Sequence, residues 1–159
     1  MNKSKVSIII LNYNGALDTI DCLISLSKCT YPNFNIIVVD NLSTDDSMNI
    51  LQEYISENHE NHIDSITLAK VKTSCIEKTE ITLIQSGING GYGHGNNIGI
   101  KHALADCADY VLILNNDTIV EPDFLAPLLA SAEGDPTVGI VSSKILYNHD
   151  KSKIWFNGG

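Results

Sequence analysis

Two carboxylates follow short apolar runs, at points where the strands of a sheet would end. Asp40 comes directly after "IIVV", and Asp117 follows "YVLIL" and two asparagines. Carboxylate oxygens are hard ligands that suit Mg²⁺ or Mn²⁺, and these ions commonly take one or two protein carboxylates and complete their shell with water and substrate phosphates. One acid would therefore suffice to hold a cation, provided that a diphosphate on the substrate supplied further ligands.

Each carboxylate also has a structural alternative. Asp40 could cap the helix expected to follow it, although Ser43 and Thr44 are better placed for that role. Asp117 could belong to a turn or form an Asx cap that closes "NNDT", because Asn and Asp readily bond their own backbone in turns. Their common position, at the ends of strands in one sheet, favours ligand binding for both.

A glycine-rich stretch, "SGINGGYGHGNN", precedes a predicted helix. The dinucleotide fingerprint G-x-G-x-x-G fails here, because its third glycine would fall on Asn96 or Ile98. A phosphate-binding P-loop fails as well, since the stretch contains no G-K-S or G-K-T. What remains is a loop of small residues where the backbone can approach a ligand closely and Asn96 or Asn97 can cap or bind, with a turn or packing role as the alternative.

Alternating apolar runs and amphipathic segments indicate how these residues are positioned. Short apolar runs predict strands at 5–11, 34–39, 81–85 and 110–114. The lack of clean alternation at 5–11 and 34–39 is typical of strands buried on both faces, and 110–114 is expected to be a buried strand. Helices are expected at 16–29, 43–58, about 96–106 and 123–132, the second with Ser43 or Thr44 as its N-cap. This alternation predicts an α/β fold with a mostly parallel sheet flanked by helices.

In such a sheet, ligands bind outside the carboxyl ends of the strands. The residues that follow the predicted strands are hydrogen-bonding side chains, glycines and the two carboxylates. They are Asn12, Tyr13 and Asn14 after the first strand, Asp40, Asn41 and Ser43 after the second, the glycine-rich stretch after the third, and Asn115, Asn116 and Asp117 after the fourth. We therefore expect them to gather at one edge of the sheet.

The composition limits the classes of protein. With 159 residues, of which 43% are hydrophobic, the chain suits one domain with a sizeable core. A net charge of -9 and scattered basic residues argue against nucleic acid as a partner. No apolar run approaches the roughly 20 residues of a transmembrane segment, and the N-terminus lacks the apolar stretch of a secretion signal. We expect a cytoplasmic protein, with a peripheral position at the inner face of the membrane as an open option.

Several residues with reactive or ligating side chains have a structural interpretation. His59 and His62 could be imagined as metal ligands, but they lie among Glu and Asn, which favours a solvated loop. Residues 59–78 are expected to be a loop or small hairpin insertion, and the aromatic run "KIWF" near the end is expected to be a strand entering a turn. The cysteines form no C-x-x-C pair and are expected to be reduced thiols. They are Cys22, Cys29, Cys75 and Cys107.

Six segments, taken in order, resemble the inverting family 2 glycosyltransferases of the GT-A (nucleotide-diphospho-sugar transferase) fold, in particular a bacterial rhamnosyltransferase-like branch that acts on cell-surface polysaccharides. They are "VSIIILNYNG", "IIVVDNLSTDDS", "NGGYGHGNNIGIKHA", "YVLILNNDTIVEPDFL", "VGIVSSKILY" and "IWFNGG". The resemblance spans nearly the whole chain. It implies that residues 1–159 form a nucleotide-sugar-binding domain that is incomplete at its C-terminus.

The resemblance implies a UDP-sugar or dTDP-sugar donor and a glycan or lipid-linked glycan acceptor. Asp40 would face the base, Asn115 would lie near the ribose, and Asp117 would bind the Mn²⁺ or Mg²⁺ that bridges the donor phosphates in the family's D-x-D segment. Many members carry Asp at the position of Asn115, so metal binding would depend mainly on Asp117. The implied donor-binding residues are Asn12, Tyr13, Asn14, Asp40, Asn41, Asn89, Gly91, Asn97, Asn115 and Asn116.

The mechanism implied is a direct displacement with inversion, in which a carboxylate base deprotonates an acceptor hydroxyl that attacks the anomeric carbon. In the family this base lies downstream of the segments quoted above, so we expect it beyond Gly159. Glu121 and Asp123 lie near Asp117, but a solvated helix start is expected for both. Two other functions stay open: a non-catalytic nucleotide-sugar-binding or interaction module, and a dinucleotide-dependent oxidoreductase, which the failed glycine pattern disfavours.

Overall fold

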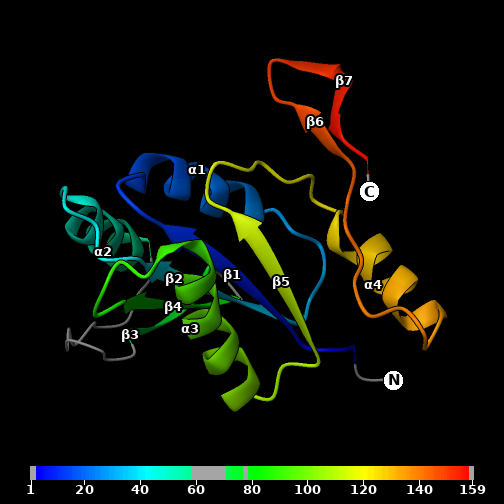
Figure 1. Cartoon of the computed structure of the whole chain (residues 1–159), viewed down its shortest axis with the longest axis horizontal. Coiled ribbons are helices and arrows are strands. Elements are labelled where there is room, and N and C mark those ends of the chain that lie inside the picture. The colour runs from blue at the N-terminus through cyan, green and yellow to red at the C-terminus, as the bar shows by residue number, and fades with distance from the viewer. Residues whose placement is uncertain (1–2, 59–70, 77–78, 158–159) are drawn as a thin grey trace.

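The computed structural model describes residues 3–58, 71–76 and 79–157. Its centre is a five-stranded sheet with the order β3-β4-β2-β1-β5 (Figure 1). Strands β4, β2, β1 and β5 run parallel, and β3 pairs antiparallel with β4, which confirms the predicted α/β fold. The strands are β1 (Val6–Asn12), β2 (Phe34–Asp40), β3 (Val71–Ile76), β4 (Thr79–Gln85) and β5 (Tyr110–Asn115).

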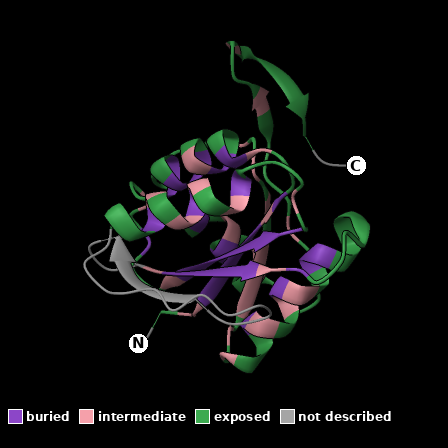
Figure 2. Ribbon diagram, turned by 90° about the vertical axis from the view of Figure 1, so that its left-hand side faces the viewer, coloured by how far each residue is buried: buried purple, intermediate pink, exposed green. Residues whose placement is uncertain are grey.

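Helices cover both faces of this sheet. They are α1 (Ala16–Leu26), α2 (Ser47–Glu57), α3 (Gly91–Ala105) and α4 (Leu125–Gly134). Ile8 and Ile10 of β1 belong to a core shared with α1, α2 and α4, whereas Ile9 belongs to a second core beneath α3. Because successive side chains of a strand point to opposite faces, a central strand needs apolar residues at nearly every position. Figure 2 shows the buried residues concentrated on these central strands.

Helix α3 lies close to β1 because two of its glycines face the sheet. A Cβ atom at Gly99 would lie 2.6 Å from Cγ2 of Ile9, and one at Gly95 would overlap the side chain of Leu11. The helix begins at Gly91, about five residues before the predicted start. The prediction of a loop with an asparagine cap is therefore wrong, since this close packing outweighs the low helix propensity of glycine.

Two further predictions are wrong in detail. The sequence predicts that β5 is a buried strand, but β5 is an edge strand of the described sheet and Ile113 is 44% exposed. The sequence also predicts Ser43 or Thr44 as the N-cap of α2, whereas this helix begins at Ser47 after Asp46. An apolar run alone does not show whether its strand lies at the centre or at the edge of the sheet. A hydroxyl near the start of a helix can form its hydrogen bond with a residue outside the helix.

Beyond α4 the chain forms an antiparallel hairpin of β6 (Ile145–Tyr147) and β7 (Asp150–Phe156). Strand β7 contains the aromatic run that the sequence predicts to be a strand. The hairpin stands clear of the main sheet in Figure 1. An exposed ion pair, Lys151 Nζ to Glu121 Oε1 at 2.9 Å, joins it to the segment after β5 and lowers the pKa of the Glu121 carboxyl.

Some predictions fall on residues that the structure does not describe. His59 and His62 lie outside the described residues, as do 59–70 and 77–78 of the predicted insertion, so the insertion stays a prediction. Cysteines 22, 29 and 107 are free thiols, as expected. No helix in the described ranges is long and apolar enough to cross a bilayer.

Candidate functional site

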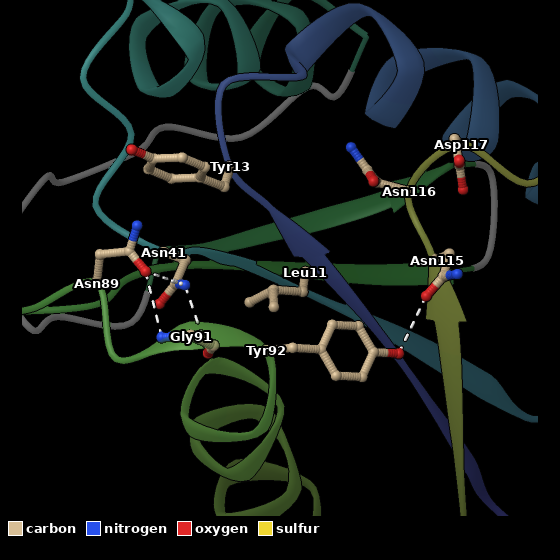
Figure 3. Close-up of a pocket in the computed structure, with 9 residues that line it drawn as sticks. All are labelled: Leu11, Tyr13, Asn41, Asn89, Gly91, Tyr92, Asn115, Asn116 and Asp117. Carbon is tan, nitrogen blue, oxygen red and sulfur yellow. Dashed lines mark hydrogen bonds between the residues drawn. The ribbon is translucent and has the colours of Figure 1, made fainter.

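The parallel register brings the carboxyl ends of three strands to one edge of the sheet. Asn12 of β1 is paired with Asp40 of β2, and Leu11 is paired with Asn115 of β5. A cavity of about 400 Å³ opens at this edge, a size typical of sites for small ligands. Its lining residues, drawn in Figure 3, are Leu11, Tyr13, Asn41, Asn89, Gly91, Tyr92, Asn115, Asn116 and Asp117.

Most of the predicted site residues line this cavity. Those that do are Tyr13, Asn41, Asn89, Gly91, Asn115, Asn116 and Asp117. Asn12, Asn14, Asp40 and Asn97 are not among its lining residues. Two lining residues, Leu11 and Tyr92, were not predicted. Tyr92 carried a usable signal, because it is the aromatic residue of a stretch that otherwise consists mainly of small residues.

One wall of the cavity joins the loop after β2 to the start of α3. The Asn41 Nδ2 atom donates to Asn89 Oδ1 at 2.8 Å and to the Gly91 carbonyl at 3.4 Å. The Gly91 N–H in turn donates to Asn89 Oδ1 at 3.2 Å. Gly91 has φ of +80°, which a residue with a side chain rarely adopts. Tyr13 stands over this wall with its ring 46% exposed, so a planar group could stack on it (Figure 3).

The opposite wall is the loop that follows β5. The Tyr92 hydroxyl donates to Asn115 Oδ1 at 3.0 Å, and this contact joins the start of α3 to the end of β5. The Asp117 side chain is exposed, and no hydrogen bond within the described residues engages its carboxylate. The turn considered for Asp117 is present, since Thr118 N–H donates to the Asn115 carbonyl at 3.3 Å, but the Asp117 carboxylate caps no backbone N–H among the described residues. Its carboxylate is therefore available to a ligand.

Asp40 directly precedes the cavity-lining Asn41 and is fully buried. Its Oδ1 atom accepts from Asn12 Nδ2 at 2.8 Å and from the Ser43 hydroxyl at 2.5 Å, and its Oδ2 atom accepts from the Ser43 N–H at 3.0 Å. A carboxylate removed from water needs such donors, because an uncompensated buried charge is costly. The structural alternative for Asp40 is wrong, because the N-cap of α2 is Asp46, and the contact of Asp40 with a donor base stays a prediction.

Asn14 connects the loop after β1 to the loop after β2. Its backbone N–H donates to the Ser43 hydroxyl at 2.9 Å, and its Oδ1 atom accepts from the Thr44 N–H at 2.8 Å. Asn14 has φ of 53°, the left-handed region in which asparagine is one of the more tolerated residues. Asn97, by contrast, is exposed on α3. The donor-binding roles assigned to both asparagines stay predictions.

The oxygen atoms that line the cavity suit a hard divalent cation that also takes ligands from a substrate. Asp117 supplies one free carboxylate, and the neighbouring Asn115 and Asn116 carry amide oxygens. The described residues contain no cluster of three or more His, Cys, Asp or Glu side chains that could enclose a metal ion. The residues therefore fit Mg²⁺ or Mn²⁺ held by one carboxylate together with phosphate oxygens and water.

A buried thiol lies behind this loop. Cys22 of α1 is completely buried, and its Sγ atom lies 3.9 Å from the Asn115 carbonyl oxygen. Burial, with a smaller contribution from the negative charge of Asp117, raises the pKa of the Cys22 thiol to about 12. The thiol is thus neutral at ordinary pH.

Taken together, the fold and the cavity define an α/β domain with a polar ligand pocket at the carboxyl ends of its parallel strands. Residues 7–158 match the family model described as glycosyl transferase family 2, so the chain belongs to this family. It is 22% identical over 147 residues to the glycosyltransferase GlyG of Streptococcus pneumoniae serotype 4. That match covers 92% of this chain and 40% of GlyG, so the chain spans about two fifths of that relative's length.

Solved structures agree with the family in fold. The mannosyltransferase PcManGT from Pyrobaculum calidifontis, solved with GDP-Man and Mn²⁺, superposes with a TM-score of 0.71 at 24% identity, over 96% of this chain and 38% of that one. S. aureus TarS 1–349, solved with UDP-GlcNAc, gives a TM-score of 0.57 at 21% identity, over 89% of this chain and 40% of that one. At these identities the likeness establishes a shared fold.

Proposed function

We propose that the chain is the donor-binding part of a glycosyltransferase that moves a sugar from a nucleotide-diphosphate donor to a glycan or lipid-linked glycan, with inversion and with help from a divalent cation. The observation that carries the proposal is the position of the free Asp117 carboxylate in a cavity whose other wall holds Tyr13 and Asn41. One wall suits a nucleoside and the other suits a cation bound to a diphosphate. Membership of glycosyl transferase family 2 supports the same substrate class.

The residues divide the work of binding the donor. Tyr13 offers an exposed ring on which a base can stack, and Asn41 holds the loop beside it through Asn89. Asp117 supplies a negatively charged oxygen that can hold a divalent cation where the diphosphate would lie, and this cation would offset the repulsion between phosphate and a chain of net charge -9. A divalent cation bound there would supply the positive charge that stabilises the departing nucleoside diphosphate.

We assign the role of catalytic base to none of the carboxylates in the described part of the chain. Within the described residues, Asp117 is the carboxylate of the cavity lining. Glu121 is paired with Lys151, Asp123 is exposed ahead of α4, and neither is among the lining residues of the cavity. A rhamnosyltransferase-like activity on cell-surface polysaccharide, on the cytoplasmic side of the membrane, is the specific role that the sequence resemblance favours.

Calorimetric titration tests the proposal. The folded chain is titrated with UDP, dTDP and GDP, each with and without Mn²⁺, because the neighbouring structures carry GDP-Man or UDP-GlcNAc. We expect one nucleotide to bind more tightly in Mn²⁺ than in its absence. Failure of a folded sample to bind any of the three would contradict the proposal.

A second candidate is a non-catalytic nucleotide-sugar-binding module. The single carboxylate of the described cavity lining favours it, since displacement needs a base as well as a cation site. A donor-hydrolysis and transfer assay on the 159-residue chain separates the two functions. Turnover at enzyme-like rates would exclude the binding-only module.

A further inference from the structure

A chain of hydrogen bonds joins the end of β2 to the loop after β5. It passes through Thr19 of α1, which is fully buried and does not line the cavity. The Asn116 Nδ2 atom donates to Thr19 Oγ1 at 3.2 Å, and the Thr19 hydroxyl lies 2.9 Å from Asn12 Oδ1. Asn12 Nδ2 then donates to Asp40 Oδ1 at 2.8 Å. The two walls of the cavity are thus linked by side chains of four different segments.

The direction of every bond in this chain follows from the charge of Asp40. A carboxylate can only accept, so Asn12 must present its NH₂ group to Asp40 and its oxygen to Thr19. The Thr19 hydroxyl has one proton, which it donates to that oxygen, and its lone pair then accepts from Asn116. The Gly15 carbonyl also lies 3.0 Å from the Thr19 hydroxyl, but it already accepts the Thr19 backbone N–H at 3.1 Å, whereas the buried Asn12 Oδ1 has no other donor among the described residues.

This polarity fixes the orientation of the Asn116 amide. Its nitrogen is held by Thr19 and, at 3.3 Å, by the Gly15 carbonyl. In Figure 3 the nitrogen of Asn116 points away from Leu11 and Tyr92. The amide oxygen is therefore turned away from α1, and no hydrogen bond within the described residues engages it. Asn116 directly precedes Asp117, so the orientation of its amide also restrains the loop that carries the Asp117 carboxylate.

We propose that Thr19 is a positioning residue. Its hydroxyl donates to Asn12, whose orientation is set by the Asp40 carboxylate, and accepts from Asn116. Thr19 thereby holds the 115–117 loop in the position that faces the cation and diphosphate of the sugar donor. The part of this inference that concerns the donor rests on the proposed function. Thr19 itself touches no ligand. Its role differs from that of a packing residue, because it depends on a hydroxyl that donates to one side and accepts from the other.

Nuclear magnetic resonance tests the hydrogen-bonded chain without any ligand. We expect the side-chain NH₂ protons of Asn116 to exchange with water more slowly than those of the exposed Asn97. Thr19→Val should shift the Asn116 resonances and speed their exchange, and Thr19→Ser should preserve both. Thr82→Val, a matched change of a buried threonine on β4, should leave them unchanged. Fast exchange of the Asn116 amide in the wild-type chain would overturn the proposal, even if Thr19→Val failed to fold.

Titration with the nucleotide that the wild type binds best then tests the functional part. Loss of one hydrogen bond predicts that Thr19→Val binds about tenfold more weakly in Mn²⁺ and gains less affinity from the ion, whereas Thr19→Ser behaves like the wild type. An unchanged gain from Mn²⁺ in folded Thr19→Val would overturn the positioning role. If the wild type bound no nucleotide while the amide protons responded as expected, the proposed function would fail and the link between the loops would stand.

Discussion

Asp40 and Asp117 both follow parallel strands at the same edge of the sheet, but their surroundings are opposite. Asp40 is fully buried and accepts three hydrogen bonds from Asn12 and Ser43. Asp117 is exposed, and no side chain in the described parts of the structure bonds to its carboxylate. A carboxylate at the end of a strand stabilises the fold when the protein itself supplies its hydrogen-bond partners, and it is available to bind a ligand when the protein does not.

The largest expected contrast is in stability. Asp40→Ala removes a buried acceptor and leaves the hydrogen-bond donors of Asn12 and Ser43 without a partner. We therefore expect the free energy of unfolding to fall by about 3 kcal/mol or more. Asp117→Ala removes an exposed group without partners and should change it by no more than about 0.5 kcal/mol. Urea denaturation of the two variants measures both values. Equal losses would show that the two carboxylates do not differ in the way proposed.

The next contrast concerns the two walls of the cavity. Tyr13→Ala removes the exposed ring on the nucleoside side, and loss of base stacking predicts nucleotide binding weaker by about tenfold or more. Because this ring is far from the proposed cation, the factor should be the same with and without Mn²⁺. Calorimetry at both conditions measures it. A loss seen only in Mn²⁺ would place Tyr13 on the wrong wall.

A smaller effect is expected from Tyr92→Phe. This change removes the hydroxyl that donates to Asn115 Oδ1 at 3.0 Å and keeps the ring. Since Tyr92 is 59% exposed, water replaces the lost bond, and we expect affinity in Mn²⁺ to fall by about threefold. The same titration measures this value. A loss above about thirtyfold would indicate a direct contact between the hydroxyl and the ligand.

The smallest expected effect is that of Asp117 on the pKa of the buried Cys22 thiol. Burial and the charge of Asp117 raise the pKa of Cys22 to about 12 from 9.0, so the neutral thiol is favoured in the folded state. The stability that this provides is complete below pH 9 and is lost as the pH rises towards 12. Asp117→Asn should lower the pKa of Cys22 slightly, because burial is the larger cause. The pH dependence of alkylation, followed by mass spectrometry, measures it.

The exposed Cys107 is the control for that experiment. We expect it to react with iodoacetamide at a pH where Cys22 of the folded chain does not. Reaction of both thiols at the same rate near pH 8 would contradict the burial of Cys22 in solution. Cys22→Ala should remove the part of the alkaline loss of stability that the thiol causes.

Much of the fold and of the site follows from local patterns. The apolar runs located β1, β2, β4 and β5, and the rule that ligands bind at the carboxyl ends of parallel strands placed Asn41, Asn115 and Asp117 at one cavity. These predictions succeed because strand direction and strand ends are set by sequence that is local to each strand.

The failures have a common physical cause, which is packing between distant segments. The start of α3 was missed because Gly95 and Gly99 reveal their role only against Leu11 and Ile9. Ser43 was expected to cap a helix but donates to Asp40 instead. Thr19 gave no sequence signal, since its partners come from three other segments of the chain.

The position of Asp117 in the proposed cation site is tested most directly by titrating the wild type and Asp117→Ala with the preferred nucleotide, with and without Mn²⁺. Asp123→Ala, which alters an exposed acid outside the described cavity lining, is the matched control. We predict that Mn²⁺ strengthens nucleotide binding by the wild type and by Asp123→Ala, and that it no longer does so for folded Asp117→Ala. An undiminished effect of Mn²⁺ on Asp117→Ala would contradict the account.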